Sequence, residues 1–339
     1  MEANIKAISY YIPPEELDNE HLHLSFPEWP SEKIFAKTGI HKRHIAGADM
    51  LSSDMAVMAA EQLFAEHHID RSSIDFVMLC TQSPDYFLPT TACLIQERLH
   101  LPVTAGAFDY NLGCSGFVYG LAIAKGLIYA GIASNILLLT AETYSKFLHP
   151  ADKSNRTIFG DAAAATLVTA DKGFAAIGDF DLGTDGKGAE NLIVKNGVLR
   201  HPKQSAETEV AHDEYGNTIS DDYLFMNGAE IFNFTSEMVP ALVHNLLEKH
   251  KLTAEDIDLY VFHQANKFML NHLRKKIKIE EEKFFLFLEN CGNTVSSTIP
   301  IALAEAIKAG RVKDKDKILL AGFGVGYSWG GSILTINGS

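Results

Sequence analysis

The sequence FDYNLGCSGFVYG, Phe108 to Gly120, joins an apolar, strand-like segment to a helix-like segment through a glycine-containing turn. The turn places one thiol, Cys114, at the start of the expected helix. A helix N-terminus presents unpaired backbone N–H groups and a partial positive charge. A cysteine in this position fills the core, closes a disulfide, holds a metal or attacks a substrate, and the rest of the chain must decide between these roles.

The strand–turn–helix order around Cys114 occurs twice. Apolar runs introduced by Ile-Asp lie at Ile74–Ser83 (IDFVMLCTQS) and Ile257–Asn266 (IDLYVFHQAN). Each follows an expected helix, Met55–Glu66 before the first run and Met238–His250 before the second. A second strand-like run and a glycine-containing turn follow each one, TAGAFDYNLGCSG in the first half and KFFLFLENCGNTVSS in the second. Two copies of one order, with strands rich in Val, Ile and Leu, predict a duplicated α/β fold whose sheets are covered by helices on both faces.

We place the seam between the two copies at residue 172, because GFAAIGDFDLGTDG restarts the pattern of NIKAISYYIPPEE soon after it. The predicted halves are residues 1–172, with Cys114, and residues 173–339, with His263 and Asn293. Cys114 and Asn293 occupy corresponding turns, and His263 follows a strand end, where open α/β sheets collect ligands. If the halves are related by a two-fold axis, these three side chains meet at the interface between them.

The chain is acidic, with a formal net charge of −14 over 339 residues. Binding to nucleic acid or to an anionic membrane needs a basic surface, so we expect neither partner. The N-terminus lacks the basic start and the apolar run of a signal peptide. The apolar region 110–141 is interrupted by Lys125 and by several polar residues, which favours a buried core over a membrane span. We expect a cytoplasmic protein.

The four cysteines form no CxxC pair and no Cys/His spacing typical of zinc. They are Cys80, Cys93, Cys114 and Cys291. We expect free thiols in a reducing compartment and no metal site. Most buried thiols only fill the core. Cys114 differs because a helix start and a nearby imidazole lower the pKa of a thiol, and the adjacent glycines leave room for a substrate carbonyl. This setting favours covalent catalysis through a thioester.

The other candidates each have a structural alternative. A histidine directly after an apolar strand, such as His263, is often a buried core residue, and Asn293 is placed to cap the following helix. Gly322–Ser332, GFGVGYSWGGS, contains G-x-G-x-G, yet the helix and acidic residue of a dinucleotide-binding unit do not follow. We interpret this segment as a tight hairpin whose N–H groups complete an oxyanion hole.

Six segments along nearly the whole chain are similar to the 3-oxoacyl-[acyl carrier protein] synthase III family of the thiolase superfamily. They are KTGIHKRHI, CSGFVYGL, IFGDAAAATLV, HQAN, CGNTVSS and FGVGYSWGG, in this order. The resemblance implies a five-layered αβαβα fold, a homodimer and a Cys-His-Asn catalytic set, here Cys114, His263 and Asn293. It also implies CoA or phosphopantetheine thioesters as substrates, an acyl carrier protein as partner and no resident cofactor.

The implied reaction is a decarboxylative Claisen condensation. Cys114 resembles the nucleophile that accepts an acyl group, and His263 and Asn293 resemble the pair that polarises the malonyl thioester carbonyl. Loss of CO2 leaves an enolate, whose oxygen needs hydrogen-bond donors more than a strong base. The enolate then attacks the acyl-cysteine, and the backbone N–H groups of Cys114 and Val325 would bind the resulting oxyanion. Thiolases proper use a second catalytic cysteine, whereas His263 and Asn293 stand at the aligned positions here, which disfavours Cys291 as a second nucleophile.

The sequence departs from the family where a CoA donor would be held. Relatives that take acetyl-CoA clamp its adenine between a tryptophan and an arginine. Here Lys33 and Lys153 stand in the corresponding segments, SEKIFAKTG, which also holds Lys37, and HPADKSNRT. Neither lysine offers a flat stacking face. This favours an acyl-carrier-protein donor, or a CoA held mainly through its phosphates, over acetyl-CoA.

Further substrate contacts are expected at two places. Leu88 stands where some members have a phenylalanine that reaches across the dimer to limit chain length, and the neighbouring Phe87 is placed to substitute for it. After HQAN, Lys267 and Phe268 occupy the place of an arginine that often contacts the carrier protein. A basic cluster follows, which recognises an acidic carrier or is simply a solvated helix end: Arg274, Lys275, Lys276 and Lys278. The polar segment 201–222 is expected to be a lid or a surface loop.

We therefore expect a condensing enzyme that acts on an acyl thioester and malonyl-[acyl carrier protein]. A first alternative is an acyltransferase that delivers the acyl group to an alcohol or amine in specialised metabolism, which the intact His263 and Asn293 disfavour. A second is a non-catalytic subunit that binds the carrier protein. Such subunits commonly lack the nucleophile, so the presence of Cys114 argues against it.

Overall fold

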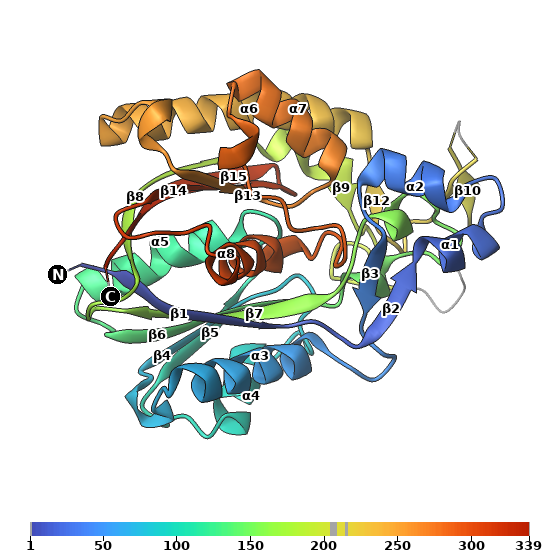
Figure 1. The fold of residues 1–339 in the computed structure, drawn as a ribbon. Helices are drawn as coiled ribbons and strands as arrows, with labels where there is room; N and C mark the ends of the chain where they lie inside the picture. Colours follow the sequence, from blue (N-terminus) through green and yellow to red (C-terminus); the bar gives the residue numbers. More distant parts are fainter. Residues whose placement is uncertain (1, 204–208, 214–215, 339) are drawn as a thin grey trace.

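Helices and strands alternate in five layers in the computed structural model, which describes residues 2–203, 209–213 and 216–338 (Figure 1). The outer helical layers are α3 (Ser52–His67) with α4 (Thr91–Arg98), and α6 (Gly228–His250) with α7 (Lys267–Ile277). The central layer is α5 (Gly116–Tyr129) with α8 (Thr298–Lys308). Strands fill the two layers between them, which gives the αβαβα arrangement predicted from the sequence.

The two strand layers form one hydrogen-bonded series, β13-β14-β15-β8-β1-β7-β6-β4-β5. The first layer contains β1 (Asn4–Tyr11), β4 (Phe76–Cys80), β5 (Gly106–Tyr110), β6 (Asn135–Glu142) and β7 (Ala162–Thr169). The second contains β8 (Ala175–Thr184), β13 (Leu259–Phe262), β14 (Lys317–Gly324) and β15 (Ser328–Ile336). Strands β1 and β8 pair only at Asn4–Ala176 and Ile5–Ala175. The layers are therefore joined at one short seam and diverge to admit α5 and α8 (Figure 1).

Small side chains let the layers approach one another. All eight residues of β7, AAAATLVT, are buried. Because successive strand residues face opposite sides, Ala163 and Ala165 pack in the cluster that contains α3, while Ala162 and Ala164 pack against Ile301 of α8. Helices α5 and α8 are apolar on nearly every face, as is typical of helices enclosed between two sheets.

Residues Phe284–Leu288, which were expected to form a strand, do not form one. They make one isolated parallel bridge, between Tyr260 and Phe284. The amide side chain of Gln264 takes the place of the missing strand pairing, because its Nε2 donates to the Phe285 carbonyl (3.3 Å) and its Oε1 accepts the Phe287 N–H (2.7 Å). The helix expected at 238–250 is also longer than predicted, because Asn227 caps it and it begins at Gly228.

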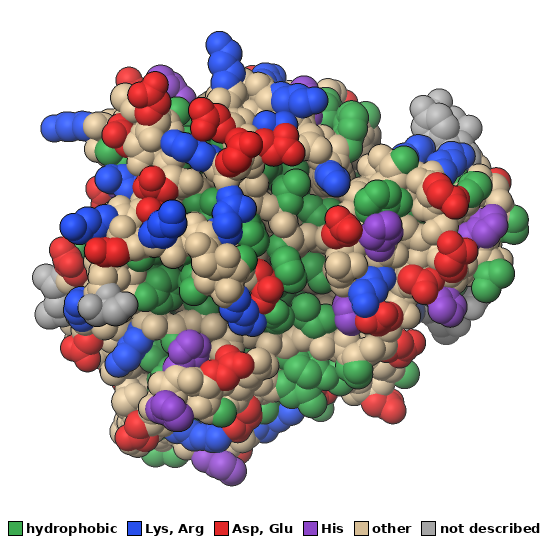
Figure 2. All heavy atoms as spheres, viewed as in Figure 1, with side chains coloured by type: hydrophobic (Ala, Val, Ile, Leu, Met, Phe, Trp, Pro, Cys, Tyr) green, Lys and Arg blue, Asp and Glu red, His purple; other side chains and the backbone are tan. Residues whose placement is uncertain are grey.

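A smaller lobe lies beside the five layers, at the right in Figure 1. It contains β2 (Glu15–Asp18), α1 (Asn19–Ser25), α2 (Ser31–Thr38), β3 (Lys42–Ile45) and the two-residue strands β10 (Ala211–His212) and β11 (Thr218–Ile219). Strands β9 (Leu192–Ile193) and β12 (Phe225–Met226) pair near the base of this lobe. Acidic and basic side chains are interspersed on the face drawn in Figure 2. Over the described residues, no helix combines the length and the apolar composition that a membrane crossing requires.

Candidate active site

Cys114 lies at the inner end of the first strand layer, two residues before α5 begins. Its side chain is 6% exposed. The hairpin between β14 and β15 packs directly against it, and a Cβ added at Gly324 would lie 2.7 Å from the sulfur. Ser328 of the same hairpin donates to the Val325 carbonyl (2.9 Å) and therefore accepts the hydroxyl of Ser115 (2.6 Å). The hairpin thus holds the start of α5 through Ser328. Gly324 can lie this close to the thiol because it has no side chain.

A cavity of about 170 Å³ brings the three candidate catalytic side chains together. Cys114, His263 and Asn293 all line it, although they come from three separate parts of the chain. The remaining lining is largely apolar: Ile158, Phe159, Leu192, Met226, Ile231, Ala265, Met269 and Phe323, with Gly228, Thr235, Asn266 and Gly324. A cavity of this kind excludes water around the thiol and strengthens every hydrogen bond made inside it.

Asn293 is held by its backbone, which leaves its amide nitrogen for the cavity. Its N–H donates to the Ile158 carbonyl (2.9 Å) and its carbonyl accepts the Gly160 N–H (3.0 Å). Its Oδ1 accepts the N–H of Val295 (2.9 Å), a residue held at φ +55°. Within the described part of the chain, Nδ2 has no protein acceptor, so it is a donor available to a ligand.

His263 ends β13 and is 2% exposed. Its Nδ1 lies 2.7 Å from the Thr298 hydroxyl, and the ring of Phe323 stands nearly perpendicular to the imidazole at 5.7 Å between centroids. Burial lowers the pKa of His263 from 6.5 to about 3, and the Val295 carbonyl opposes that shift. The imidazole is therefore neutral at physiological pH, with Nδ1 held by Thr298.

The thiol of Cys114 is also neutral in the free protein. Burial raises its pKa to about 12, and the negative charge of Glu142 adds to the shift. The backbone N–H groups of Val325 and Cys114 point towards the sulfur and lower the pKa, but they do not outweigh burial. The expectation that the helix start and the imidazole lower this pKa is therefore wrong for the free protein, because a closed, apolar site penalises the thiolate more than nearby dipoles stabilise it.

The segment Gly322–Ser332 is the expected hairpin and not a dinucleotide loop. Strands β14 and β15 pair antiparallel from Lys317–Thr335 to Gly324–Ser328. The three residues 325–327 close the turn beside the thiol. Among the described residues, no group of three or more His, Cys, Asp or Glu side chains is placed to hold a metal ion. The four cysteines are unpaired; Cys93 is exposed and the other three are buried.

This chain matches known proteins along its whole length. The family model of 3-oxoacyl-[acyl-carrier-protein] synthase III matches residues 108–186, and the model of its C-terminal part matches residues 247–336. A beta-ketoacyl-[acyl-carrier-protein] synthase III of Clostridium perfringens is 36% identical over 335 residues, which cover 98% of this chain and 99% of the relative. One from Caldanaerobacter subterraneus is 34% identical over 333 residues, with 98% and 97% covered.

The chain belongs to the 3-oxoacyl-[acyl-carrier-protein] synthase III family. Solved structures agree with this assignment. A crystal structure of a 3-oxoacyl-(acyl-carrier-protein) synthase III is similar at a TM-score of 0.96 and 50% identity over all of both chains. A 3-oxoacyl-(acyl-carrier protein) synthase from Burkholderia xenovorans is similar at 0.90 and 35% identity, covering 99% of this chain and 95% of that one.

The three lysines expected near the donor site, Lys33, Lys37 and Lys153, contact Glu28 or Trp29. Lys153 forms an ion pair with Glu28 (3.1 Å), and the Nζ of Lys33 donates to the Glu28 carbonyl (3.4 Å). The ammonium groups of Lys33 and Lys37 lie 5.2 and 4.4 Å from the centre of the Trp29 ring. Trp29 was not singled out from the sequence, although it precedes Lys33 by four residues and Lys37 by eight, a spacing that places all three on one side of the chain entering α2.

The segment 201–222 packs partly onto the same region. Its residues 204–208 and 214–215 lie outside the described part of the chain. Strands β10 and β11 form a short antiparallel pair, and Asn217 follows the turn between them. Its amide donates to Asp152 (3.0 Å) and accepts the backbone N–H of Lys153 (2.9 Å). This segment therefore helps to position Lys153.

Phe87 and Leu88 do not contribute to the cavity of their own chain. They are 76% and 82% exposed, and Tyr86 beside them is 61% exposed. They are found on the surface loop between β4 and α4. The loop therefore presents three consecutive exposed apolar side chains.

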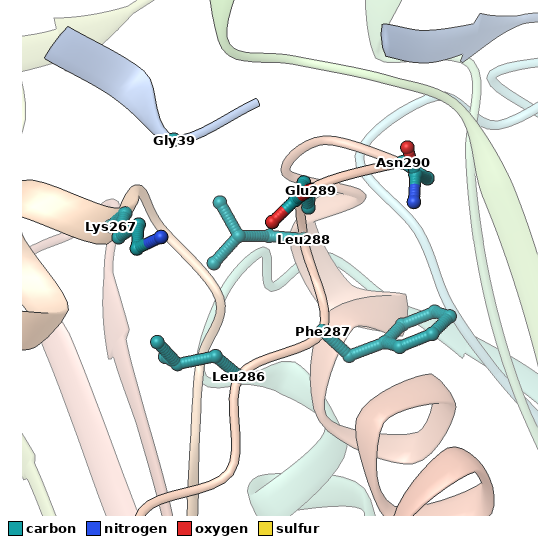
Figure 3. A pocket seen from close by; sticks show the side chains of 7 residues that line it. All are labelled: Gly39, Lys267, Leu286, Phe287, Leu288, Glu289 and Asn290. Carbon is teal, nitrogen blue, oxygen red and sulfur yellow. The ribbon is translucent and has the colours of Figure 1, made fainter. Parts of the chain in front are cut away.

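The basic residues after His263 occupy two different environments. Lys267 lines a separate surface cavity of about 280 Å³ together with Gly39 and residues 286–290, and its ammonium points towards the loop that holds Leu288 and Glu289 (Figure 3). Arg274 is half-buried and braces the end of α7, because it donates to the Ile279 carbonyl and to Glu281 (3.3 Å each). Lys275, in contrast, is exposed in the last turn of α7.

Two supporting residues, Thr298 and Glu142, were not singled out from the sequence. Thr298 holds the imidazole of His263. Glu142 is a fully buried carboxyl whose negative charge acts on Cys114. Glu142 could have been noticed in the sequence only as the charged residue that ends the largely apolar run NILLLTAE.

Proposed function

We propose that the protein condenses an acyl thioester primer with malonyl-[acyl carrier protein], with loss of CO2, to give a 3-oxoacyl-[acyl carrier protein]. One observation carries this proposal. A thiol, a neutral imidazole and a carboxamide with an available N–H donor line one largely apolar cavity. Membership of the synthase III family supports the same reaction class. In this proposal the protein acts as an acyltransferase without a resident cofactor.

In the first half-reaction Cys114 takes the acyl group. Its Sγ attacks the thioester carbonyl carbon, the new C–Sγ bond forms, and the bond from that carbon to the donor sulfur breaks. The thiol proton passes to the departing sulfur, and the neutral imidazole of His263 is placed to carry it. The backbone N–H groups of Cys114 and Val325, which point towards the sulfur, would bind the negative oxygen formed in the attack.

In the second half-reaction the malonyl thioester loses CO2. The bond to its carboxylate breaks, and the electron pair moves into an enolate whose oxygen would face Asn293 and His263. Asn293 Nδ2 would donate a hydrogen bond to this oxygen, and so would His263 in the tautomer that carries its proton on Nε2 and accepts the Thr298 hydroxyl at Nδ1. These bonds stabilise a charge that develops only during the reaction, and they therefore lower its barrier. The enolate carbon then attacks the acyl carbonyl, the C–C bond forms and the C–Sγ bond breaks. The released sulfur regains one proton, taken up from solvent.

Delivery of the acyl group to an alcohol or amine is not favoured. That reaction has no use for a carboxamide whose Oδ1 is already occupied by the Val295 N–H and whose Nδ2 remains as a donor for an enolate oxygen. A non-catalytic subunit is not favoured either, because the nucleophile is present at the cavity. The relatives reported above are all synthases.

We further propose that the primer arrives on an acyl carrier protein. Of the cations near a CoA site, Lys153 is already neutralised by Glu28 and only 12% of its side chain is exposed. Lys33 and Lys37 lie over the Trp29 ring and so compete with an adenine for the same face. A carrier protein needs no adenine clamp, because exposed lysines such as Lys275 at the end of α7 attract an acidic surface. Lys267 extends this basic face beside its own cavity (Figure 3).

We propose that the protein works as a homodimer. Strand β5 stands at the end of the nine-stranded series, so one side of its backbone has no strand partner within the described chain. An unpaired edge of this kind is a template for pairing with another chain. The exposed loop of Tyr86, Phe87 and Leu88 follows the neighbouring strand β4 and would be covered by the same contact. We also place the protein in the reducing cytoplasm, where three buried, unpaired thiols remain reduced.

The proposed reaction is tested by incubating purified protein with acyl-[acyl carrier protein] and malonyl-[acyl carrier protein]. The expected result is CO2 release, a 3-oxoacyl product and an acyl adduct on Cys114 in the intact mass spectrum. Cys114→Ala should lose the adduct and the product. Cys291→Ala removes another buried thiol and should keep both. Normal condensation by Cys114→Ala would refute the mechanism, and an acyl-CoA donor preferred over the carrier-protein form would refute the donor assignment.

A further inference from the structure

Glu142, the last residue of β6, is a fully buried carboxyl that the half-reactions do not use. Its oxygens accept the backbone N–H of Gln82 (3.0 and 3.2 Å), the hydroxyl of Ser83 (3.2 Å) and the hydroxyl of Ser296 (3.0 Å). No described residue forms an ion pair with it. A carboxyl in this setting is costly to ionise, and its retention in the core needs a reason beyond packing.

Glu142 helps to anchor the segment that contains Asn293. Ser296 lies three residues after Asn293, in the short helix Val295–Ser297, and donates to Glu142 across the interface between the two halves of the chain. Ser297 donates to the carbonyl of Thr140 (3.1 Å), which lies two residues before Glu142 on β6. The Asn293 segment therefore docks on the end of β6 through two neighbouring serines, of which only Ser296 touches the carboxyl.

Glu142 also lies close to the turn that carries Cys114, because it accepts the backbone N–H of Gln82, and the Gln82 Oε1 lies 2.6 Å from where a Cβ on Gly113 would stand. The titratable groups around it are Cys80 of β4, Cys114, Tyr144 and Asp161. Burial raises the pKa of Glu142 to about 8. The hydrogen bonds from Gln82, Ser83 and Ser296 oppose that shift, and the negative charge of Asp161 adds to it. When ionised, Glu142 raises the pKa of Cys80, Cys114 and Tyr144 in turn. Every group of this cluster becomes negative on losing its proton, so each disfavours the ionisation of the others.

We propose that Glu142 is a positioning residue of the acyl-transfer site: it fastens the Asn293 segment behind Cys114, and its charge state sets how readily the Cys114 thiol loses its proton. While Glu142 holds its own proton, its carboxyl adds no negative charge to the site and a thiolate costs less. Once Glu142 ionises, the thiolate is suppressed. The inference rests on the proposed function only in taking Cys114 as the nucleophile.

Alkylation by iodoacetamide tests this directly, because it reports the thiolate fraction and needs no substrate. The rate at Cys114 is followed by peptide mass spectrometry from pH 6.5 to 9.5, with the exposed Cys93 of the same molecule as internal reference. In Glu142→Gln the rate relative to the unchanged protein should be close to one at pH 6.5. It should rise at least about threefold by pH 9.5, the change produced by half a pKa unit, while Cys93 stays constant. A ratio at Cys114 that is the same at every pH would overturn the proposal.

A pair of serine variants decides the matter even if Glu142→Gln does not fold. The Ser296 hydroxyl lowers the pKa of Glu142, so Ser296→Ala keeps the carboxyl protonated to higher pH. Cys114 should then alkylate faster than in the unchanged protein at pH 8.5 and equally fast at pH 10. Ser297→Ala loosens the same segment without touching Glu142 and should leave the profile unchanged. If both serine variants change the profile alike, segment position and not the charge of Glu142 controls the thiol. Absent condensation in the unchanged protein would refute the proposed function but would leave this result standing.

Discussion

At the scale of single residues, burial moves the pKa of Cys114 to about 12 and that of His263 to about 3. Both groups are consequently uncharged at pH 7, and the site holds no preformed thiolate–imidazolium pair. This suits a reaction in which a proton travels from the attacking thiol to the departing thiol, because no charge must be desolvated before the substrate enters. In the proposed reaction the enolate oxygen would meet the neutral Asn293 and His263, and no Lys or Arg is among the described residues that line the cavity.

Thr298 should be needed to hold His263 in this arrangement. Thr298→Val keeps the shape of the side chain and removes the hydroxyl that contacts Nδ1 at 2.7 Å. The variant also loses the hydrogen bond from this hydroxyl to the Val295 carbonyl (3.0 Å). Loss of the bond to His263 alone, about 1 kcal/mol, should lower the condensation rate by roughly fivefold to tenfold. Thr298→Ser retains the hydroxyl and should stay close to the unchanged rate. Equal losses in both variants, measured as kcat/KM for condensation, would show that the methyl group and not the hydroxyl matters.

His263 should also make the fold sensitive to acid. Its pKa lies near 3 in the folded state and at 6.5 ordinarily, so the unfolded chain binds more protons between these values. Stability contributed by His263 is therefore complete above pH 6.5 and is lost as pH falls. Glu142 has the opposite sign, since its pKa is raised from 4.5 to about 8 and its contribution grows on acidification.

Comparison with His263→Gln isolates the histidine. Relative to the unchanged protein, this variant should gain up to about 2.7 kcal/mol in unfolding free energy between pH 6.5 and 4.5, at about 1.36 kcal/mol per pH unit. Urea unfolding at several pH values measures the difference. A stability difference that does not vary with pH would mean that His263 is protonated in the folded protein.

That the three candidate catalytic side chains meet in one cavity could be predicted from the sequence, and their ionisation could not. Cys114, His263 and Asn293 stand in short motifs whose order along the chain is specific. Their pKa values depend on how completely the layers close over them, which no local pattern records. Trp29 was missed for a different reason, because the family pattern drew attention to Lys33, four residues further on.

At the scale of elements, the β14–β15 hairpin sets the position of the nucleophile. Gly324 faces the sulfur so closely that a methyl group in Gly324→Ala would lie 2.7 Å from it. The hairpin or Cys114 must then move, and acylation of Cys114 should fall at least about tenfold, since small misplacements in a catalytic site are costly.

Gly126→Ala is the matched control for this substitution. Gly126 lies in α5 with open space where a Cβ would be placed, so the change should leave acylation intact. It should raise the unfolding free energy by up to about 1 kcal/mol, because alanine is the better helix former. Intact-mass acylation and urea unfolding measure both effects. Undiminished acylation in Gly324→Ala would show that the hairpin does not constrain the thiol.

Most helices and strands could be predicted from the periodicity of apolar residues and from the turn residues between them. The two exceptions arise because a side chain makes hydrogen bonds that the local pattern does not indicate. The run Phe284–Leu288 has the composition of a strand, yet the amide of Gln264 satisfies the Phe285 carbonyl and the Phe287 N–H. A pattern read along one segment gives no sign that a glutamine elsewhere in the chain replaces a strand partner. The early start of α6 depends on the Asn227 cap, which precedes the apolar pattern.

At the scale of the whole molecule, the five layers follow from the duplicated order of strands and helices. Apolar helices α5 and α8 need a sheet on each side, and the alanine-rich β7 allows them to approach closely. The lobe that contains α1, α2 and the described parts of 201–222 carries no such repeat, so its position near Lys153 was not predictable.

Assembly is tested at the exposed loop before α4. Phe87→Asp replaces a side chain that is 76% exposed in the single chain, so the fold should be unaffected. Burying a charge in a dimer contact should weaken the dimer at least about tenfold. Leu24→Asp, at a position 78% exposed in α1, should leave the dimer unchanged. Sedimentation velocity over a concentration series distinguishes the two, and equal behaviour of both variants would argue against this loop as the contact.

A single-turnover experiment tests the central claim that one cavity performs both half-reactions through Cys114. Protein acylated on Cys114 is freed of donor and mixed with malonyl-[acyl carrier protein] labelled in its free carboxylate. The account predicts one labelled CO2 released for each acyl group lost from Cys114, with a matching amount of 3-oxoacyl-[acyl carrier protein]. Loss of the acyl group without CO2, or CO2 release that leaves the acyl group on Cys114, would contradict it.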